Sequence, residues 1–422
     1  MALIGAIADD LTGASDLALG FAKAGLRTEQ VMDASGVAGS DAQALVVALK
    51  SRTIPPGEAV AASLEALEAL REAGCRRIFF KYCSTFDSTE RGNIGPVTEA
   101  LQQALGATAT VASPAFPENA RSVYMGHLFV GDTLLSDTHM RDHPLTPMRD
   151  SNLVRVLASQ SRGGVGLIAR PTVAAGSGAI AAAIGKARDE GLAHLVADAI
   201  DAVDLDRLGE ALIDAPLVTG GSGLGAGIAR ALARRENISA PEAAAWRRPE
   251  GPAFVLSGSC SAATAGQVER FATTRPAHRI DPLAAVADPE SAFRESLDWA
   301  AARLGDGPAL VYSTAEPRTV RAAQEKYGAE RTSAALEGIT GRLAVELVGR
   351  GCRRLVVAGG ETSGAVIGAL GVKRLAIGPE IAPGVPWTRG VAASGDELEL
   401  VLKSGNFGGP DFFDTALAGP AA

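Results

Sequence analysis

Short apolar runs alternate with longer Ala-rich segments along the first half of the chain. The apolar runs predict buried strands, and the Ala-rich segments, which end near glycines, predict helices. The predicted strands are residues 3–8, 44–49, 77–82 and 108–112, and the predicted helices are 14–24, 58–73 and 94–105. This alternation is typical of a parallel sheet covered by helices.

The alternation stops between residues 113 and 147, where Pro, His and Asp replace helical periodicity. We interpret this segment as an insertion near a functional site, with part of a hairpin at 122–130. Three further strands follow it, at 166–169, 194–197 and 216–219.

The polar segment 236–251 has weak periodicity and predicts a domain boundary. Beyond it, a second block has predicted strands at 253–256, 309–312, 354–357 and 375–377, a helix at 333–349, and a strand with a Gly-rich loop at 397–414. We therefore expect an α/β fold with two α/β domains, residues 1–240 and 250–422, whose mostly parallel sheets surround an inter-domain cleft.

Composition narrows the function classes. The 422 residues are 47% hydrophobic, which is ample for packed cores, and their net charge of -8 argues against nucleic acid as a partner. The 4 cysteines are scattered, so neither a disulfide framework nor a zinc ribbon is expected. The N-terminus does not resemble a signal peptide, and no apolar run of ~20 residues occurs. We expect a cytoplasmic protein that does not bind membranes.

Asp9 and Asp10 follow the first predicted strand directly, and Thr12 and Gly13 precede the next helix. Open α/β sheets bind ligands at the carboxyl ends of their strands. Paired carboxylates at that edge can orient polyol hydroxyls, hold Mg²⁺ or accept a proton. The structural alternative is a helix N-cap, in which Asp10 or Thr12 accepts backbone N–H groups.

A second polar loop, KYCSTFDSTERGN at 81–93, also lies between a strand and a helix. Arginine can bind a carboxylate through two parallel hydrogen bonds, which suits a sugar acid. The alternative is a capped turn with a surface ion pair. The candidate residues of this loop are Lys81, Asp87, Ser88, Arg91 and Asn93.

Three small-residue segments, which we call the glycine loops, follow predicted strands of the second domain. They are SGSCSAAT at 257–264, AGGETSGA at 358–365 and KSGNFGG at 403–409. Such loops let backbone N–H groups and helix N-termini approach phosphates. Glycines that serve only tight turns are the alternative. Three such loops in one domain, each with Ser or Thr, favour a nucleotide site.

Two other motifs suggest different chemistry. TGGSGLGAG at 219–227 could be a dinucleotide turn, although helix–sheet packing explains it better. His139 and His143 stand four residues apart, as metal ligands on a helix would, but Pro144 and Pro147 argue against a long helix there. If residues 219–227 bound a dinucleotide, the chain would be an NAD-dependent hydroxy-acid dehydrogenase. If its two lobes bound a sugar acid without catalysis, it would be a sugar-acid sensor.

Taken together, the motifs resemble the four-carbon acid sugar kinase family over nearly the whole chain. The resemblance rests on ADDLTGASD at 8–16, DSTERGNIGP at 87–96, GGETSGAV at 359–366, IGPEIAPGVPW at 377–387 and LKSGNFG at 402–408. KYCSTFDST, in which five residues separate Lys81 from Asp87, and RDHPLTPMRDSNL at 141–153 look like the 3-oxo-tetronate kinase subgroup. Threonate and erythronate kinases tend to have a shorter spacing.

The resemblance implies an N-terminal domain that binds the sugar acid and a C-terminal domain that binds ATP with Mg²⁺. It implies transfer of the γ-phosphoryl group to the C4 hydroxyl of 3-oxo-tetronate, with D-threonate or D-erythronate as alternative acceptors. Asp9, Asp10, Lys81 and Arg91 are the expected catalytic residues, and Asp87, Ser88 and Asn93 join them in binding the acid. The expected ATP contacts are Ser257, Ser259, Gly359, Gly360, Glu361, Thr362, Ser363 and Gly405. No protein residue is assigned to the metal, and a homo-oligomer remains open.

Overall fold

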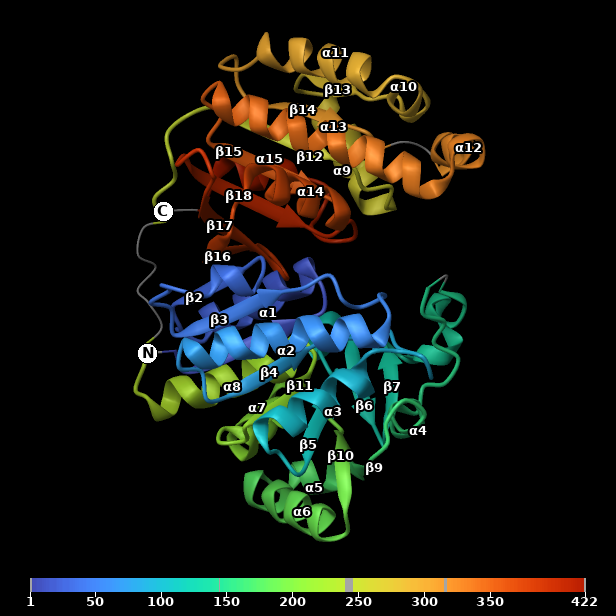
Figure 1. Cartoon of the computed structure of the whole chain (residues 1–422), viewed down its shortest axis with the longest axis vertical. Coiled ribbons are helices and arrows are strands. Elements are labelled where there is room, and N and C mark those ends of the chain that lie inside the picture. Colours follow the sequence, from blue (N-terminus) through green and yellow to red (C-terminus); the bar gives the residue numbers. More distant parts are fainter. Residues whose placement is uncertain (1, 144, 240–245, 315–316, 421–422) are drawn as a thin grey trace. The chain divides into compact units, whose positions relative to one another are not determined.

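The computed structural model describes residues 2–143, 145–239, 246–314 and 317–420. The chain divides into two compact units, Met1–Pro241 and Glu242–Ala422, which we call unit 1 and unit 2. Unit 1 runs from blue to yellow-green in Figure 1, and unit 2 from yellow to red. Each unit contains its own mostly parallel sheet, which confirms the predicted α/β class.

The sheet of unit 1 has the strand order β2-β3-β1-β4-β11-β5-β10-β9, and these neighbouring strands pair in parallel. Its central strands are apolar on both faces because helices cover both, as buried parallel strands require. The strands are β1 (Ile4–Ala8), β2 (Thr28–Val31), β3 (Ala44–Ala48), β4 (Ile78–Lys81), β5 (Thr110–Ser113), β9 (Gly164–Ile168), β10 (Leu192–Ala197) and β11 (Leu217–Gly220).

Small residues allow the helices of unit 1 to pack closely. An added Cβ at Gly209 of α7 would collide with the backbone of Gly227 in α8, so glycine is required at this contact. The helices are α1 (Leu11–Lys23), α2 (Pro56–Glu72), α3 (Ile94–Leu105), α4 (Leu153–Ala158), α5 (Arg170–Ala174), α6 (Ser177–Asp189), α7 (Ala202–Leu212) and α8 (Ser222–Arg235).

The predicted insertion contains a small antiparallel sheet. Strands β6 (Arg121–Tyr124) and β7 (His127–Val130) pair as the expected hairpin, and β8 (Thr133–Leu134) extends it. Short 3-10 turns follow at Leu135–Asp137 and His139–Asp142.

The sheet of unit 2 has the order β13-β14-β12-β15-β18-β17-β16. The part from β13 to β18 is parallel, whereas β16, β17 and β18 form an antiparallel meander. The strands are β12 (Ala253–Ser257), β13 (Ala277–Arg279), β14 (Ala309–Tyr312), β15 (Arg354–Ala358), β16 (Arg374–Ala382), β17 (Val385–Val391) and β18 (Glu397–Lys403).

Helices also cover the sheet of unit 2. Phe271 of α9 and Phe412 and Phe413 of α15 pack with the strand residues Val255, Val356 and Val401 in one buried core. The helices are α9 (Ala262–Ala272), α10 (Pro282–Ala287), α11 (Pro289–Ala301), α12 (Pro317–Tyr327), α13 (Ala329–Gly349), α14 (Gly360–Leu370) and α15 (Phe412–Ala418).

Most strands lie within two residues of their predicted positions, but β2, β8, β13 and β17 were not predicted. Strands β2 and β13 are short, with Glu29 and Gln30 in β2 and His278 and Arg279 in β13, so neither has the expected apolar run. The expected cleft between the domains stays a prediction.

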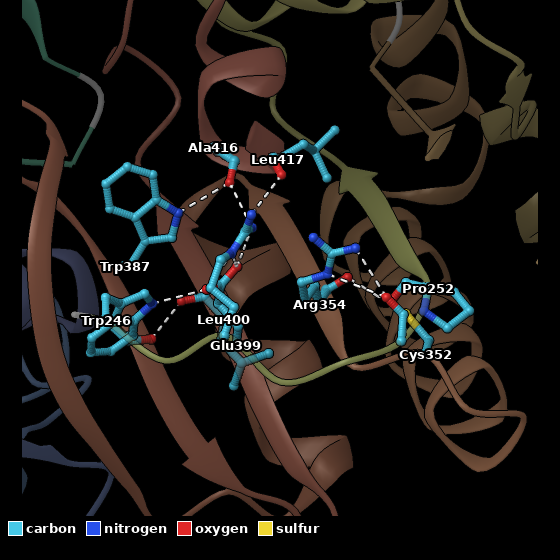
Figure 2. A network of polar contacts seen from close by, with 12 residues as sticks. Trp246, Pro252, Cys352, Arg354, Trp387, Glu399, Leu400, Ala416 and Leu417 are labelled. Carbon is cyan, nitrogen blue, oxygen red and sulfur yellow. Dashed lines mark hydrogen bonds and ion pairs between the residues drawn. The ribbon is translucent and has the colours of Figure 1, made fainter. Parts of the chain in front are cut away.

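A buried ion pair anchors the segment that leads into unit 2. The Glu399 carboxylate accepts hydrogen bonds from Arg248 Nη2 at 2.6 Å and from Trp246 Nε1 at 2.9 Å. Arg248 also donates to Leu417 O, and Trp387 Nε1 donates to Ala416 O, so the same network holds the C-terminal end of α15 (Figure 2). Glu399 is 2% exposed, and its charge therefore depends on Arg248 for compensation.

Glu399→Gln should lower the free energy of unfolding of unit 2 by about 3–5 kcal/mol, because Arg248 would lose its buried counter-charge. Glu397→Gln on the same strand is the matched control: its partner Arg389 and Glu397 itself are 34% and 59% exposed, so about 0–1 kcal/mol is expected. All 3 tryptophans lie in unit 2, so their fluorescence in urea reports its unfolding. Equal midpoints for the two variants would refute the assigned role of the ion pair.

Candidate functional site

Strand register in unit 1 gathers charged side chains at one sheet edge. Ala8, the last residue of β1, is aligned with Ala48 of β3 and with Lys81 of β4. The backbone continues this alignment, because Asp9 N donates to Lys81 O and Arg52 N donates to Asp9 O. The carboxyl ends of three parallel strands thus bring Asp9, Lys81 and Arg52 together, at the edge where such sheets bind ligands.

Arg52 is the main partner of the two aspartates. Its Nε and Nη2 donate to the two carboxylate oxygens of Asp9 at 2.9 and 2.8 Å, and Nη2 lies 3.1 Å from Asp10 Oδ2. Burial disfavours the guanidinium charge, but Asp9 and Asp10 overcome this effect and raise the pKa of Arg52 further above its usual value. The sequence reasoning missed Arg52, although a basic residue just after the strand at 44–49 was a usable signal.

The two aspartates have different exposure and different hydrogen-bond partners. Asp9 is 6% exposed and bound on both oxygens by Arg52, and burial raises its pKa while Arg52 opposes that rise. The Asp10 side chain is 29% exposed. Asp10 also caps α1, since its Oδ1 accepts from Gly13 N at 2.7 Å and its Oδ2 from Thr12 Oγ1 at 3.3 Å. The N-cap interpretation is therefore correct, yet Asp10 remains the more accessible carboxylate.

Lys81 lies beside this pair. It is 3% exposed, and its Nζ donates to Tyr82 O at 3.0 Å. A Cβ added to Gly13 would lie 3.0 Å from Lys81 Nζ and against Asp10 Oδ1, so glycine at this position lets the cation approach the helix start. Asp16, one turn further along α1, has its pKa raised by burial, and Lys81 opposes the rise.

The loop at 81–93 supports the segment that carries Arg52. Asn93 Nδ2 donates to Ser51 O at 2.6 Å and to Ile54 O at 3.0 Å. Ser88 Oγ donates to Gln160 Oε1 at 3.0 Å. These bonds direct the Asn93 amide nitrogen to the chain itself, so Asn93 fixes the Arg52 segment.

A pocket of about 740 Å³ lies next to these residues. Its lining includes four of the predicted substrate residues and Arg52, together with residues of the segment 145–159. Asp9, Asp10 and Lys81 are not part of this lining, so Arg52 connects the pocket with the aspartate pair. Its charged and polar lining residues include Arg52, Asp87, Ser88, Arg91, Asn93, Arg149, Asp150 and Arg155.

Arginines make the pocket suitable for an anion. Arg155 binds Asp150 through two hydrogen bonds of 2.7 Å, which lower the pKa of that carboxyl group. Arg91 and Arg149 are exposed at the pocket and have no ion pair within the described part of the chain. Sequence reasoning singled out Arg91 but not Arg149, whose motif was used only for the subgroup resemblance.

Strand register also assembles the glycine loops of unit 2. Ser257 at the end of β12 is aligned with Ala358 of β15, and Ala358 with Lys403 of β18. Gly258 N donates to Ala358 O and Gly359 N to Lys403 O, both at 2.9 Å. The three loops therefore leave the sheet side by side.

The glycine loops touch one another where side chains would not fit. A Cβ at Gly359 would lie 3.2 Å from Ser259 N, and this residue has a φ of 124°, which favours glycine. A Cβ at Gly405 would lie 3.0 Å from Ser261 Oγ and would collide with Ser259 Oγ. The predicted ATP-binding residues thus form one cluster within unit 2.

The start of α14 fits a phosphate group. Its N-cap, Gly359, provides no side-chain hydrogen bond, so N–H groups of the first turn are left for a ligand. Among the described residues, a Cβ at Gly360 would have no contact within 4 Å beyond its own turn of helix, and the Ser363 hydroxyl is buried with no hydrogen-bond partner. Glu361 is exposed and Thr362 buried, whereas the Ser257 hydroxyl pairs with Thr314 Oγ1 at 2.9 Å.

The structure does not favour the dinucleotide interpretation of residues 219–227. Added Cβ atoms at Gly220, Gly221 and Gly223 would meet backbone atoms of residues 113–116. Protein chain therefore fills the space that a pyrophosphate would need, and the glycines serve packing.

The metal-ligand interpretation of His139 and His143 gains no support either. His143 Nδ1 accepts a hydrogen bond from Thr146 N at 3.1 Å. Within the described residues, no group of three or more His, Cys, Asp or Glu side chains could hold a metal ion.

No helix among the described residues is long and apolar enough to cross a membrane.

Comparisons with known proteins find one matching domain in unit 1 and another in unit 2. Residues 4–228 match the model of a sugar-binding N-terminal domain, and residues 254–413 match that of a nucleotide-binding C-terminal domain. These two domains define a kinase that phosphorylates an alcohol group of a small molecule. The chain belongs to the four-carbon acid sugar kinase family, which confirms the resemblance of its motifs.

Several relatives are similar over nearly their full length. A 3-oxo-tetronate kinase from Cupriavidus necator is 52% identical and one from Burkholderia multivorans 51% identical, each over 98% of this chain and 96% of the relative. The crystal structure of a Salmonella typhimurium protein is 42% identical, covers 99% of both chains and has a TM-score of 0.90. That of a Haemophilus influenzae protein is 41% identical, covers 98% of this chain and 99% of its own, and has a TM-score of 0.84.

Gly360→Val should abolish measurable ADP binding while leaving the fold intact, because an added Cβ there is free of contacts among the described residues and the side chain fills the space before the α14 amides. Isothermal titration calorimetry with ADP measures the effect. Gly368→Val is the matched control, since Gly368 lies on the same helix and an added Cβ there is also free of contacts. ADP binding by the Gly360 variant at wild-type strength would remove α14 from the nucleotide site.

Proposed function

We propose that this protein is an ATP-dependent 3-oxo-tetronate kinase that phosphorylates the C4 hydroxyl of its substrate to give 3-oxo-tetronate 4-phosphate. The observation that carries the proposal is the 51–52% identity to 3-oxo-tetronate kinases over 98% of the chain. Two sites of the right chemistry support it: an arginine-lined pocket in unit 1 and a glycine cluster at a helix N-terminus in unit 2.

The acid substrate binds in unit 1. Arg91, exposed at the pocket, holds the carboxylate, and Asp87 and Ser88 accept or donate hydrogen bonds to the substrate hydroxyls. Ser88 Oγ, now bonded to Gln160, can exchange that partner for a substrate oxygen. Lys81 supplies a buried positive charge close to Asp10, where it stabilises negative charge that develops during transfer.

Asp10 orients the acceptor hydroxyl and accepts its proton. It is the better candidate of the two aspartates because Arg52 occupies both oxygens of Asp9 and Asp10 is more exposed. Arg52 fixes the two carboxylates relative to each other, and Asn93 fixes Arg52 through the backbone of 51–54. Asp9, Arg52 and Asn93 thus act as positioning residues for Asp10.

The nucleotide binds in unit 2. Backbone amides of Gly360, Glu361 and Thr362 and of Gly405 bind the phosphates, and Ser259, Thr362 and Ser363 add hydroxyl groups. Mg²⁺, when bound, neutralises phosphate charge during transfer. We assign it mainly to the phosphates and water, since Mg²⁺ is commonly held by substrate phosphates with few protein ligands.

The free cysteines Cys75, Cys83, Cys260 and Cys352 suit a reducing compartment, and we place the enzyme in the cytoplasm.

The proposal is tested by measuring ADP release with 3-oxo-tetronates, D-threonate, D-erythronate and no acceptor. We expect the highest kcat/KM with a 3-oxo-tetronate and a product phosphorylated at C4, identified by ³¹P NMR. Faster turnover of D-threonate or D-erythronate would reassign the substrate within the family. Absence of acceptor-dependent ADP release, with NAD reduction or ligand binding alone, would contradict the kinase assignment.

Asp10→Asn should lower kcat by about 10²- to 10⁴-fold, because it removes the proton acceptor but keeps an N-cap for α1. The ADP dissociation constant should stay within about twofold of wild type, since the nucleotide contacts lie in the other unit. Steady-state kinetics with calorimetric ADP titration separates the two effects. An unchanged kcat would remove Asp10 from the chemistry.

A further inference from the structure

Lys403 is a buried cation at the end of β18 that none of the roles above uses. Its side chain is fully buried, and its Nζ donates to Thr264 Oγ1 at 2.8 Å and to Gly405 O at 3.1 Å. The Nζ also lies 5.8 Å from the centre of the Phe412 ring. The hydroxyl and the carbonyl satisfy hydrogen bonds, but neither carries a charge that compensates the ammonium group.

No acidic side chain in the described part of the chain forms an ion pair with Lys403. Among the nearby elements, Glu399 of β18 binds Arg248, Asp414 of α15 binds Arg275, and Glu361 is exposed. The elements packed around Lys403 carry other charged groups, none of which contacts Nζ. They are Arg354 of β15, Arg389 of β17, Glu397 of β18, Glu269 and Arg270 of α9, and Asp411 at the N-cap of α15. A buried charge without a counter-ion is costly, and burial lowers the pKa of Lys403 to about 8.

The position of this charge indicates what compensates it. The Gly405 carbonyl accepts hydrogen bonds from Ser261 Oγ at 2.5 Å, Thr264 Oγ1 at 2.7 Å and Lys403 Nζ at 3.1 Å. Gly405 in turn packs against Ser259 in the glycine loops. The ammonium group therefore lies directly beneath the loop that receives the phosphates, where an anion would interact with it through little solvent.

We propose that Lys403 is a positioning residue for the nucleotide: its buried ammonium group holds the Gly405 loop against α9, and the polyphosphate of the bound nucleotide is the counter-charge that the described residues do not provide. This inference rests on the proposed nucleotide site. It assigns to Lys403 an electrostatic contribution to phosphate binding in addition to its hydrogen bonds.

Lys403→Met tests the proposal because it keeps the length of the side chain and removes the charge. The free variant should be more stable than wild type below pH 8, since a buried charge without a counter-ion has been removed. It should nevertheless bind ADP about tenfold more weakly, or worse, at pH 7.5. A tenfold loss is the effect expected if ADP binding raises the pKa of Lys403 by one unit in the wild-type protein. A residue with a purely structural role would lose stability and binding together.

The pH dependence gives a second readout. The pKa of Lys403 in the folded protein, about 8, is lower than in the unfolded chain, so the unfolded state binds more protons above pH 8. Wild-type stability relative to the Met variant should therefore rise between about pH 8 and pH 10. Wild-type ADP affinity should fall over the same range, while that of the variant stays flat, because phosphate groups with a pKa of about 6 do not titrate there.

Thr264→Val is the matched control, because it removes the hydrogen bonds of this hydroxyl to Nζ and to Gly405 O but keeps the charge. We expect it to retain the wild-type fall of ADP affinity with pH. ADP binding by Lys403→Met within twofold of wild type, or the same pH dependence in both proteins, would overturn the proposal. If wild type itself bound no ADP, the proposed nucleotide site would be wrong, which is a distinguishable outcome.

Discussion

The register of parallel strands is the constraint on which both sites depend. In unit 1 it aligns the ends of β3, β1 and β4, so that Arg52, Asp9 and Lys81 emerge together. In unit 2 it aligns Ser257, Ala358 and Lys403, so that three glycine loops leave one edge. A parallel sheet directs all its strand ends to the same edge, and residues far apart in the sequence become neighbours there.

The two sites use this constraint with different chemistry. Unit 1 presents charged side chains whose positions are fixed by one another, with Arg52 between two carboxylates and Asn93 holding the backbone of Arg52. Unit 2 presents backbone amides, which need small residues such as Gly359 and Gly405 so that loops can approach closely. The first arrangement suits recognition of a hydroxylated acid, and the second suits phosphates.

Sequence reasoning reached the α/β class, most strands and the glycine loops, because each signal is local: an apolar run followed by a polar or Gly-rich turn. It also found Asp9, Asp10 and Lys81, since each stands at or directly after a strand end. Arg52 escaped because a single basic residue after a strand is a weak signal, and its role appears only once β3 pairs with β1. Lys403 escaped as an individual residue because burial and the absence of a counter-ion are properties of packing, not of sequence.

The claim that unit 2 binds nucleotide phosphates at the glycine loops is tested most directly by a crystal structure with a non-hydrolysable ATP analogue and Mg²⁺. We predict phosphate oxygens within hydrogen-bond distance of the amides at the start of α14 and of the loop at Gly405, with the Lys403 ammonium group beneath them. An analogue bound instead at the Arg52 pocket of unit 1, with the glycine loops free of phosphate, would contradict it.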